Sequence, residues 1–266
     1  MKTSFKFVVV ALGAIAMMVA CKKDDSSSDG SSTSNMQVKM VDAPSPYGFE
    51  EVNVDVRGID ANITSMATGQ SQWVTMTSEA RVYNLLSLAN GIEALIGQAT
   101  VNAGTLTQVR LHLGPHNSVK SMDGVTHNMD LAPGAETVLV NVNNEQVIAG
   151  HTFALFLDFD AAASVVNRGN GWELDPHVRA FTVASTGTVR GKVNLNLPGI
   201  AVRLENSEHV YMTYADRNVG NFMLRGAEAG TYTLKVYANN SDVPVIRTNV
   251  EVTAGNITDV GLIELQ

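Results

Sequence analysis

The sequence predicts an all-β protein, with two β-sandwich-like domains in series behind an export signal and a flexible Ser-rich tether. From Met36 onward, short runs rich in Val, Ile, Thr and Leu are separated by Gly, Asn, Asp and Pro, which is typical of strands joined by turns. The texture of these runs changes at a small polar junction near residues 184–187. We therefore expect one β domain over residues 36–183 and a second over residues 187–266.

Residues 1–20 have the pattern of a secretory signal peptide. Lys2 and Lys6 supply the positive start, and the apolar run Phe7–Ala20 is shorter than the roughly 20 residues that a membrane-spanning helix needs. The run ends directly before Cys21, the single cysteine of the chain. This arrangement resembles a bacterial lipobox, which implies cleavage before Cys21 and attachment of a palmitate-type lipid to its thiol. An ordinary signal peptide with a chance cysteine nearby is the alternative.

The residues after the cysteine contain a second localisation signal. Lys23, Asp24 and Asp25 resemble the lipoprotein export signal of Bacteroidetes, which implies display on the outer face of the outer membrane. A merely soluble linker is the alternative. Residues 21–35, which begin with Cys21 and are otherwise rich in Ser, are too polar to build a core. We expect them to act as a tether with a reach of about 20 Å.

Bulk composition excludes some partners. Without Lys2 and Lys6 the chain keeps 16 basic against 26 acidic residues, a net charge of about −10. An acidic surface argues against nucleic acid as a direct partner. With Cys21 acylated, the folded part has no thiol for a disulfide or a cysteine metal site. We expect no cofactor beyond the covalent lipid.

Alternation of apolar and polar residues places the strands of the first domain. Val52, Val54 and Val56 point one way within the clearest example, residues 51–59. The most apolar run, Thr152–Phe159, predicts a strand buried on both faces. The other expected strands cover residues 36–41, 61–66, 72–76, 105–113, 138–142 and 177–183, with hairpin turns at residues 122–124 and 168–171.

Two segments of this domain have an apolar pattern that is not clearly β. Residues 81–88 could form a strand or a helix. Ile92, Leu95, Ile96 and Ala99 have helical spacing, so we expect the only helix after the signal peptide at residues 92–101.

Local motifs connect the first domain to a known family. They are Val41–Pro44, Trp73, Asn84–Leu88 with Asn90–Gly91, Ala103–Leu111, Leu157–Ser164, and Leu174–Pro176 with Arg179. In order and spacing they resemble the bacterial lipoprotein family called domain of unknown function 4382, although Leu106 stands where an aromatic is usual. The resemblance implies a β-rich extracytoplasmic fold and supplies no activity.

The second domain predicts seven short strands, the pattern of a small β-sandwich. They are expected at residues 188–195, 200–204, 211–214, 221–224, 230–237, 245–252 and 260–265. Val189-x-Gly191-x-Val193, Pro198–Val202, Asp216 with Gly220–Phe222, and Gly230–Tyr232 resemble the carboxypeptidase regulatory-like, transthyretin-like module. That resemblance implies a structural or glycan-contacting role and no catalysis.

Asp158 and Asp160 are the strongest candidates for chemistry. They lie two residues apart and therefore on one face of a strand. Paired carboxylates could perform acid/base catalysis or bind Ca²⁺, or they could cap the strand end by bonding loop amides, which we favour. Asp42 could join them only if the first long strand lies beside theirs.

Other constellations are weaker. His112, His116 and His127 lack a metal-binding spacing. Ser164, His177 and Asp158 could be assembled into a triad, but no G-x-S-x-G elbow precedes the serine. The sequence also contains aromatic residues that could stack on sugars, although such residues more often fill a core. They are Trp73, Tyr83 and Trp172.

These observations favour a non-enzymatic lipoprotein of the outer membrane, lipid-anchored and facing the cell exterior. We expect it to bind or scaffold a glycan or another envelope protein. Two alternatives stay open: a glycan or peptide hydrolase that uses Asp158 and Asp160, and an assembly or pilus-like subunit.

Overall fold

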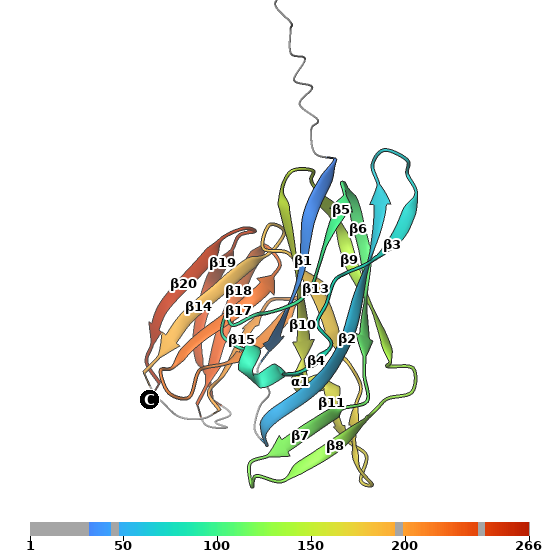
Figure 1. Ribbon diagram of the computed structural model, residues 1–266. Helices are drawn as coiled ribbons and strands as arrows, with labels where there is room; N and C mark the ends of the chain where they lie inside the picture. The colour runs from blue at the N-terminus through green and yellow to red at the C-terminus, as the bar shows by residue number, and fades with distance from the viewer. Residues whose placement is uncertain (1–31, 44–47, 195–198, 239–242, 266) are drawn as a thin grey trace, which may run out of the picture.

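A computed structural model describes residues 32–43, 48–194, 199–238 and 243–265 (Figure 1). The described chain is nearly all β, which confirms the predicted fold class. None of its helices is long and apolar enough to span a bilayer. The predicted signal peptide, Cys21 and Lys23–Asp25 lie outside the described residues.

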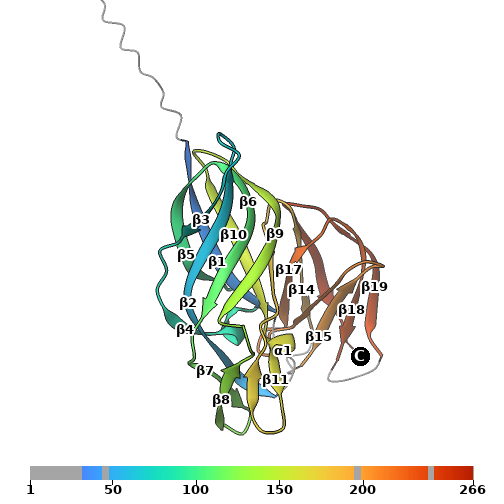
Figure 2. The ribbon, with the colours of Figure 1, turned by 90° about the vertical axis from the view of Figure 1, so that its right-hand side faces the viewer.

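The first domain packs two sheets face to face (Figures 1 and 2). One sheet has the strand order β13-β10-β1-β5. Its strands are β1 (Thr33–Ala43), β5 (Ala94–Asn102), β10 (Thr152–Asp160) and β13 (Val178–Phe181). The other has the order β11-β12-β8-β7-β2-β6-β9, with β3 and β4 also pairing with β2. Its strands are β2 (Phe49–Ser65), β3 (Ser71–Thr75), β4 (Arg81–Asn84), β6 (Gly104–Leu113), β7 (Asn117–Ser121), β8 (Thr126–Leu131), β9 (Thr137–Val147), β11 (Val165–Asn167) and β12 (Trp172–Leu174).

The core of the first domain follows from strand alternation. Val52, Val54 and Val56 of β2 are buried and join one apolar cluster with residues of both sheets. Removing such side chains from water stabilises the fold by about 1.5–3 kcal/mol each. The predicted turns at residues 122–124 and 168–171 connect β7 to β8 and β11 to β12.

The second domain is a smaller sandwich with its own core. Its two sheets have the orders β17-β14-β20 and β16-β15-β18-β19. The strands are β14 (Gly187–Val193), β15 (Ala201–Glu205), β16 (Val210–Tyr214), β17 (Asn221–Ala227), β18 (Gly230–Tyr237), β19 (Val245–Val252) and β20 (Ile257–Ile263). Within the described residues this makes the seven strands that the sequence predicts.

Strand β10 is buried on both faces, as its apolar sequence predicts. Leu155, Leu157 and Phe159 face the core of the first domain. On the opposite face, Phe156 packs with Val41 and Phe181 in a separate small cluster. Figures 1 and 2 show the second domain lying beside this outer face of the sheet. Its proximity explains why Phe156 is nearly inaccessible.

The predicted helix over residues 92–101 is wrong. This segment forms β5, which pairs antiparallel with β1. The register of that pairing shifts between Val38 and Lys39. Such an irregularity interrupts strict alternation, and it leaves Ile96 and Gly97 buried one after the other. The helical spacing did not mark a buried face, because Ile92 and Leu95 are 60% and 48% exposed.

Two short helical turns occur among the described residues of the first domain. The 3₁₀ helix η1 (Leu85–Leu88) follows β4, so residues 81–88 are part strand and part helix. One turn of helix, α1 (Ala161–Ser164), follows β10. Strand β1 begins at Thr33, three residues before the first predicted strand, so the predicted tether is too long at its end. Thr33–Asn35 pair with Thr100–Asn102 of β5.

Candidate functional site: the domain junction and its cleft

An ion pair on β10 and β13 links the two domains. The Nε of Arg179 donates to Oδ2 of Asp158 at 2.8 Å, and its Nη2 lies 2.6 Å from the same oxygen. The same guanidinium also bonds the second domain. Its Nη1 donates to the carbonyl of Gly226 at 2.8 Å, and its Nη2 donates to the carbonyl of Arg225 at 2.9 Å. The Asp158 side chain is only 11% exposed. One guanidinium therefore neutralises a buried carboxylate and caps two backbone acceptors of β17.

Further contacts reinforce the junction. The side-chain amide of Asn90 donates to the carbonyl of Tyr214 at 3.3 Å and accepts from the backbone N–H of Met223 at 3.2 Å. Glu93 pairs with Lys39 and with Arg225, the latter at 3.1 Å. Burial opposes ionisation of Glu93, but hydrogen bonds from the two cations hold its pKa below the ordinary value. The guanidinium of Arg225 also lies 4.3 Å from the centre of the Phe156 ring. Polar, ionic and aromatic contacts thus join the two domains.

A cleft of about 680 Å³ opens between β13, α1 and β16. Its lining combines aromatic, apolar and polar groups, including Asp160, His177, Arg179, Tyr211, Met212 and Tyr214. His177 is exposed, and Val210 and Met212 show 52% and 43% of their surface. The volume is in the range of pockets that hold small molecules, and position at a domain junction is common for such pockets.

Asp160 caps the helical turn that follows its strand. Its Oδ1 accepts from the backbone N–H of Ala163 at 2.9 Å. Asp160 thus bonds a backbone amide, as the capping interpretation expects, whereas Asp158 pairs with the side chain of Arg179. Both residues nevertheless line the cleft.

Asp42 lies on a strand adjacent to that of the two aspartates. β1 and β10 pair in parallel, so the condition that the two strands are neighbours is met. In the register, Asp42 is opposite Phe159, whereas Val41 is opposite Asp158 and Ala43 is opposite Asp160. The backbone therefore places Asp42 between the two aspartates along the strand direction.

Ser164 and His177 come together, but not as catalytic partners. The Ser164 hydroxyl donates to the carbonyl of Asp160 at 2.5 Å and accepts from the backbone N–H of His177 at 2.8 Å. The His177 Nδ1 lies 2.9 Å from the carbonyl of Asp175. Since the serine is fully buried and its hydroxyl contacts backbone groups, these contacts stabilise the α1 turn rather than form the arrangement of a nucleophilic triad.

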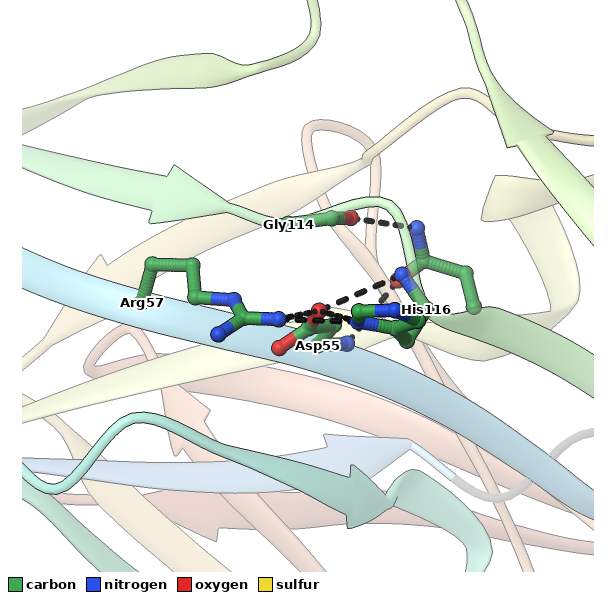
Figure 3. Close-up of polar contacts among 5 residues, drawn as sticks. Asp55, Arg57, Gly114 and His116 are labelled. Carbon is green, nitrogen blue, oxygen red and sulfur yellow. Dashed lines mark hydrogen bonds and ion pairs between the residues drawn. The ribbon is translucent and has the colours of Figure 1, made fainter.

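The other histidines occupy separate places. His112 bonds Asp60 at 2.9 Å, and His127 packs near the Trp172 ring at 6.2 Å between centroids. His116 lies over Asp55, as Figure 3 shows. No group of three or more His, Cys, Asp or Glu side chains within the described ranges is placed to hold a metal ion.

Asp55 is a buried carboxylate that organises the turn between β6 and β7 (Figure 3). Its Oδ2 accepts from Arg57 Nη2 at 2.6 Å and from the backbone N–H of His116 at 3.2 Å. Burial raises the pKa of Asp55, but these hydrogen bonds outweigh it and hold the pKa below the ordinary value. Its partners Arg57 and His116 are exposed. The role that we assign to this cluster is stabilisation of the turn.

The aromatic residues that could stack on sugars lie outside the cleft. Tyr83 is buried in the first core, and Trp172 packs edge to face on Phe49 at 5.2 Å. Trp73 stacks with the guanidinium of Arg110, 3.6 Å from its ring centre. The tyrosines of the cleft, Tyr211 and Tyr214, were not predicted as site residues, because nothing local distinguishes them from ordinary strand residues.

Comparison with known proteins gives two family matches. The model of a family described as "Domain of unknown function (DUF4382)" matches residues 33–176. A model described as "Polysaccharide lyase family 4, domain II" matches residues 184–260. The expected carboxypeptidase regulatory-like identity of the second domain is therefore replaced by this other β-module description. No curated protein matches the chain.

Solved structures give only distant likenesses. A leucine-rich repeat protein from Bacteroides thetaiotaomicron is 14% identical, with 89% of this chain and 26% of that chain covered and a TM-score of 0.22. A C-terminal fragment of the pilus adhesin SpaC from Lactobacillus rhamnosus GG is 12% identical, with coverage of 88% and 97% and a TM-score of 0.22. The Bacillus anthracis TIE protein is 12% identical, with coverage of 88% and 34% and a TM-score of 0.18. Such low TM-scores support no inference about fold or function.

The first match covers more than half of the chain. It spans the strands from β1 to β12, which include the strand β10 that carries Asp158. The chain therefore belongs to the family described as domain of unknown function DUF4382.

Proposed function

We propose that this protein is an outer-membrane lipoprotein that binds carbohydrate in the cleft between its two β domains. The proposed location is based on the sequence. An apolar export signal ends at Cys21, and Lys23, Asp24 and Asp25 follow it. The lipid on Cys21 would hold the domains at the membrane, on the exterior of a Bacteroidetes-type cell.

The observation that carries the binding proposal is the composition of the cleft. Sugar rings present apolar C–H faces bordered by hydroxyl groups, so their sites combine aromatic faces with hydrogen-bonding side chains. Tyr211, Tyr214 and Met212 supply apolar surface along β16, while His177 and Asp160 supply polar groups from the facing domain. A ligand here would touch both domains.

A second observation agrees with a carbohydrate ligand. The second domain matches a module named after a polysaccharide lyase, which associates this type of β-sandwich with polysaccharides in another family. The mature chain is acidic, which disfavours a polyanion such as nucleic acid. We therefore favour neutral or amino sugars as ligands.

Binding is favoured over hydrolysis by the contacts of the two aspartates. Asp158 is paired with Arg179, and Asp160 caps α1. A general acid and a nucleophile or base need carboxyl groups that can exchange protons or attack substrate. Carboxylates engaged in holding a domain junction and a helix turn are better suited to a fixed scaffold.

A glycan array with the full chain tests the ligand class, and two histidine variants test the site. His177 and His151 are both exposed, and each ring contacts the carbonyl two residues earlier, at 2.9 and 3.0 Å. Only His177 lines the cleft. We expect His177→Ala to weaken binding about tenfold, the equivalent of one hydrogen bond of about 1.4 kcal/mol, and His151→Ala to leave it unchanged. Equal effects, or an array without signal, would count against the cleft.

The address is tested separately in cells. Cys21→Ser should release the protein from membranes, and replacing Lys23, Asp24 and Asp25 with alanine should protect it from protease added to intact cells. If the unaltered protein already resists protease, the surface location is wrong. A pull-down that recovers an envelope protein while the array stays silent would favour the scaffolding alternative.

A further inference from the structure

A small cavity lies at the domain junction, next to the cleft. Its volume is about 30 Å³, and its lining includes Asn90, Asp158, Arg179 and Thr213. Asp158, Arg179, Tyr211 and Met212 also line the cleft. The ion pair of Asp158 and Arg179 therefore borders both spaces.

Thr213, which lines this space, has an unusual hydroxyl. The residue is 2% exposed, and its Oγ1 has no hydrogen-bond partner among the described residues. Leaving a buried hydroxyl without a partner costs about 1–3 kcal/mol. Buried polar groups in proteins are almost always satisfied by protein or by ordered water. The orphan hydroxyl and the cavity therefore need a common explanation.

We propose that the cavity is a built site for ordered water, which hydrogen-bonds Thr213 of the second domain to Asp158 and Asn90 of the first. A water needs about 10–15 Å³ of such volume and two to four polar partners, so the space holds one or two. A hydroxyl can donate to the water. The Asp158 carboxylate has about four acceptor positions and the Asn90 carbonyl has two, so both can accept from it while keeping their existing bonds.

A bound water would give Thr213 a stabilising role at the junction, where its hydroxyl would otherwise be destabilising. A valine has nearly the shape of threonine and would fill the same space without an orphan hydroxyl. Water also extends the polar network of Arg179 and Asn90 across the interface, which then has hydrogen bonds on both sides of the ion pair. The bound water lies next to the cleft, because the two spaces share part of their lining.

A crystal structure of the full chain at a resolution that shows waters is the direct test. We expect density for water within hydrogen-bond distance of Thr213 Oγ1. A dry cavity overturns the proposal, and so does a peak with the shorter contacts and higher coordination of a metal cation.

Thermal unfolding of two variants provides an independent readout. If water is bound, Thr213→Val removes one of its partners and lowers Tm by about 2–4 °C, the shift that 1 kcal/mol produces in a chain of this size. Thr213→Ser keeps the hydroxyl and should lose less. If the cavity is dry, Thr213→Val removes an orphan group, so an unchanged or raised Tm overturns the proposal.

Discussion

Arg179 bonds Asp158 of the neighbouring strand and the backbone of the second domain at the same time. The guanidinium of Arg179 bonds the Asp158 carboxylate at 2.8 Å through Nε and two carbonyls of β17 through its Nη atoms. The aspartate thus supports the domain junction through the arginine. Asp158, a candidate catalytic group in the sequence, therefore has a structural role at the junction.

Truncating this arginine should destabilise the protein. Arg179→Ala removes the cationic partner of the buried Asp158 carboxylate and the side-chain donor to two backbone carbonyls of β17. We expect a loss of about 3 kcal/mol in the free energy of unfolding, the lower end of the range for removing one partner of a buried pair, because the Arg179 side chain is 41% exposed. Urea unfolding followed by circular dichroism measures it.

Arg190 offers a matched control for that measurement. It pairs with Asp259 at 3.0 Å, but the two side chains are 49% and 52% exposed. Exposed pairs contribute about 0–1 kcal/mol, so Arg190→Ala should have little effect. Similar losses for the two variants would show that Arg179 does not hold the junction.

Regular parts of the fold could be predicted from sequence because their cause is local. Val52, Val54 and Val56 alternate with polar residues, and β2 buries that same set. The segment of β5 was misassigned for a nonlocal reason. Its strand pairs with β1, more than 50 residues away in the chain, and this pairing leaves the apolar Leu95 exposed beside the buried Ile96.

The candidate site was only partly predictable. The acidic pair Asp158 and Asp160 stands out in the sequence, and both residues do line the cleft. The roles of Arg179 and Asn90 depend on backbone groups of the second domain, 47 and 124 residues away for Gly226 and Tyr214. A hydrogen bond to a distant carbonyl leaves no pattern of residue types, so sequence could not indicate it.

Asn90 should be needed at the junction for its amide as well as its backbone. Its φ is 53°, a conformation that glycine adopts without strain. Asn90→Gly therefore keeps the backbone and removes the bonds to Tyr214 and Met223, and we expect a loss of about 1–2 kcal/mol in unfolding free energy. Chemical denaturation provides the value.

Asn144→Gly is the control for the backbone contribution. Asn144 is exposed, has a φ of 49°, and belongs to β9 of the first domain. Its replacement should change stability by a few tenths of a kcal/mol. The bridging role of Asn90 would be refuted by two variants of equal stability.

Gly114 should tolerate no side chain. A Cβ at this position would lie 2.3 Å from Oδ2 of Asp55 and 2.4 Å from Nε of Arg57. Gly114→Ala must therefore displace the buried carboxylate or the turn drawn in Figure 3, at a cost of about 1–3 kcal/mol. Gly171→Ala, where nothing lies within 4 Å, should be nearly neutral. Thermal melts that decline equally for both variants would contradict the close approach.

Asp55 should make stability depend on pH in the acid range. Its pKa is lowered in the folded protein, so its contribution is fully present above the unfolded value of about 3.9 and is lost as pH falls through the folded value. At pH 7, Asp55→Asn should lose about 2 kcal/mol, because hydrogen bonds to a charged group contribute about 1.5–3 kcal/mol. Toward pH 3 the two proteins should approach each other in stability, because protonation removes the charge from the wild-type aspartate as well. Urea unfolding at half-unit steps from pH 7 to pH 3 measures both curves, and a constant difference across that range would show that the Asp55 carboxylate is not the group that titrates.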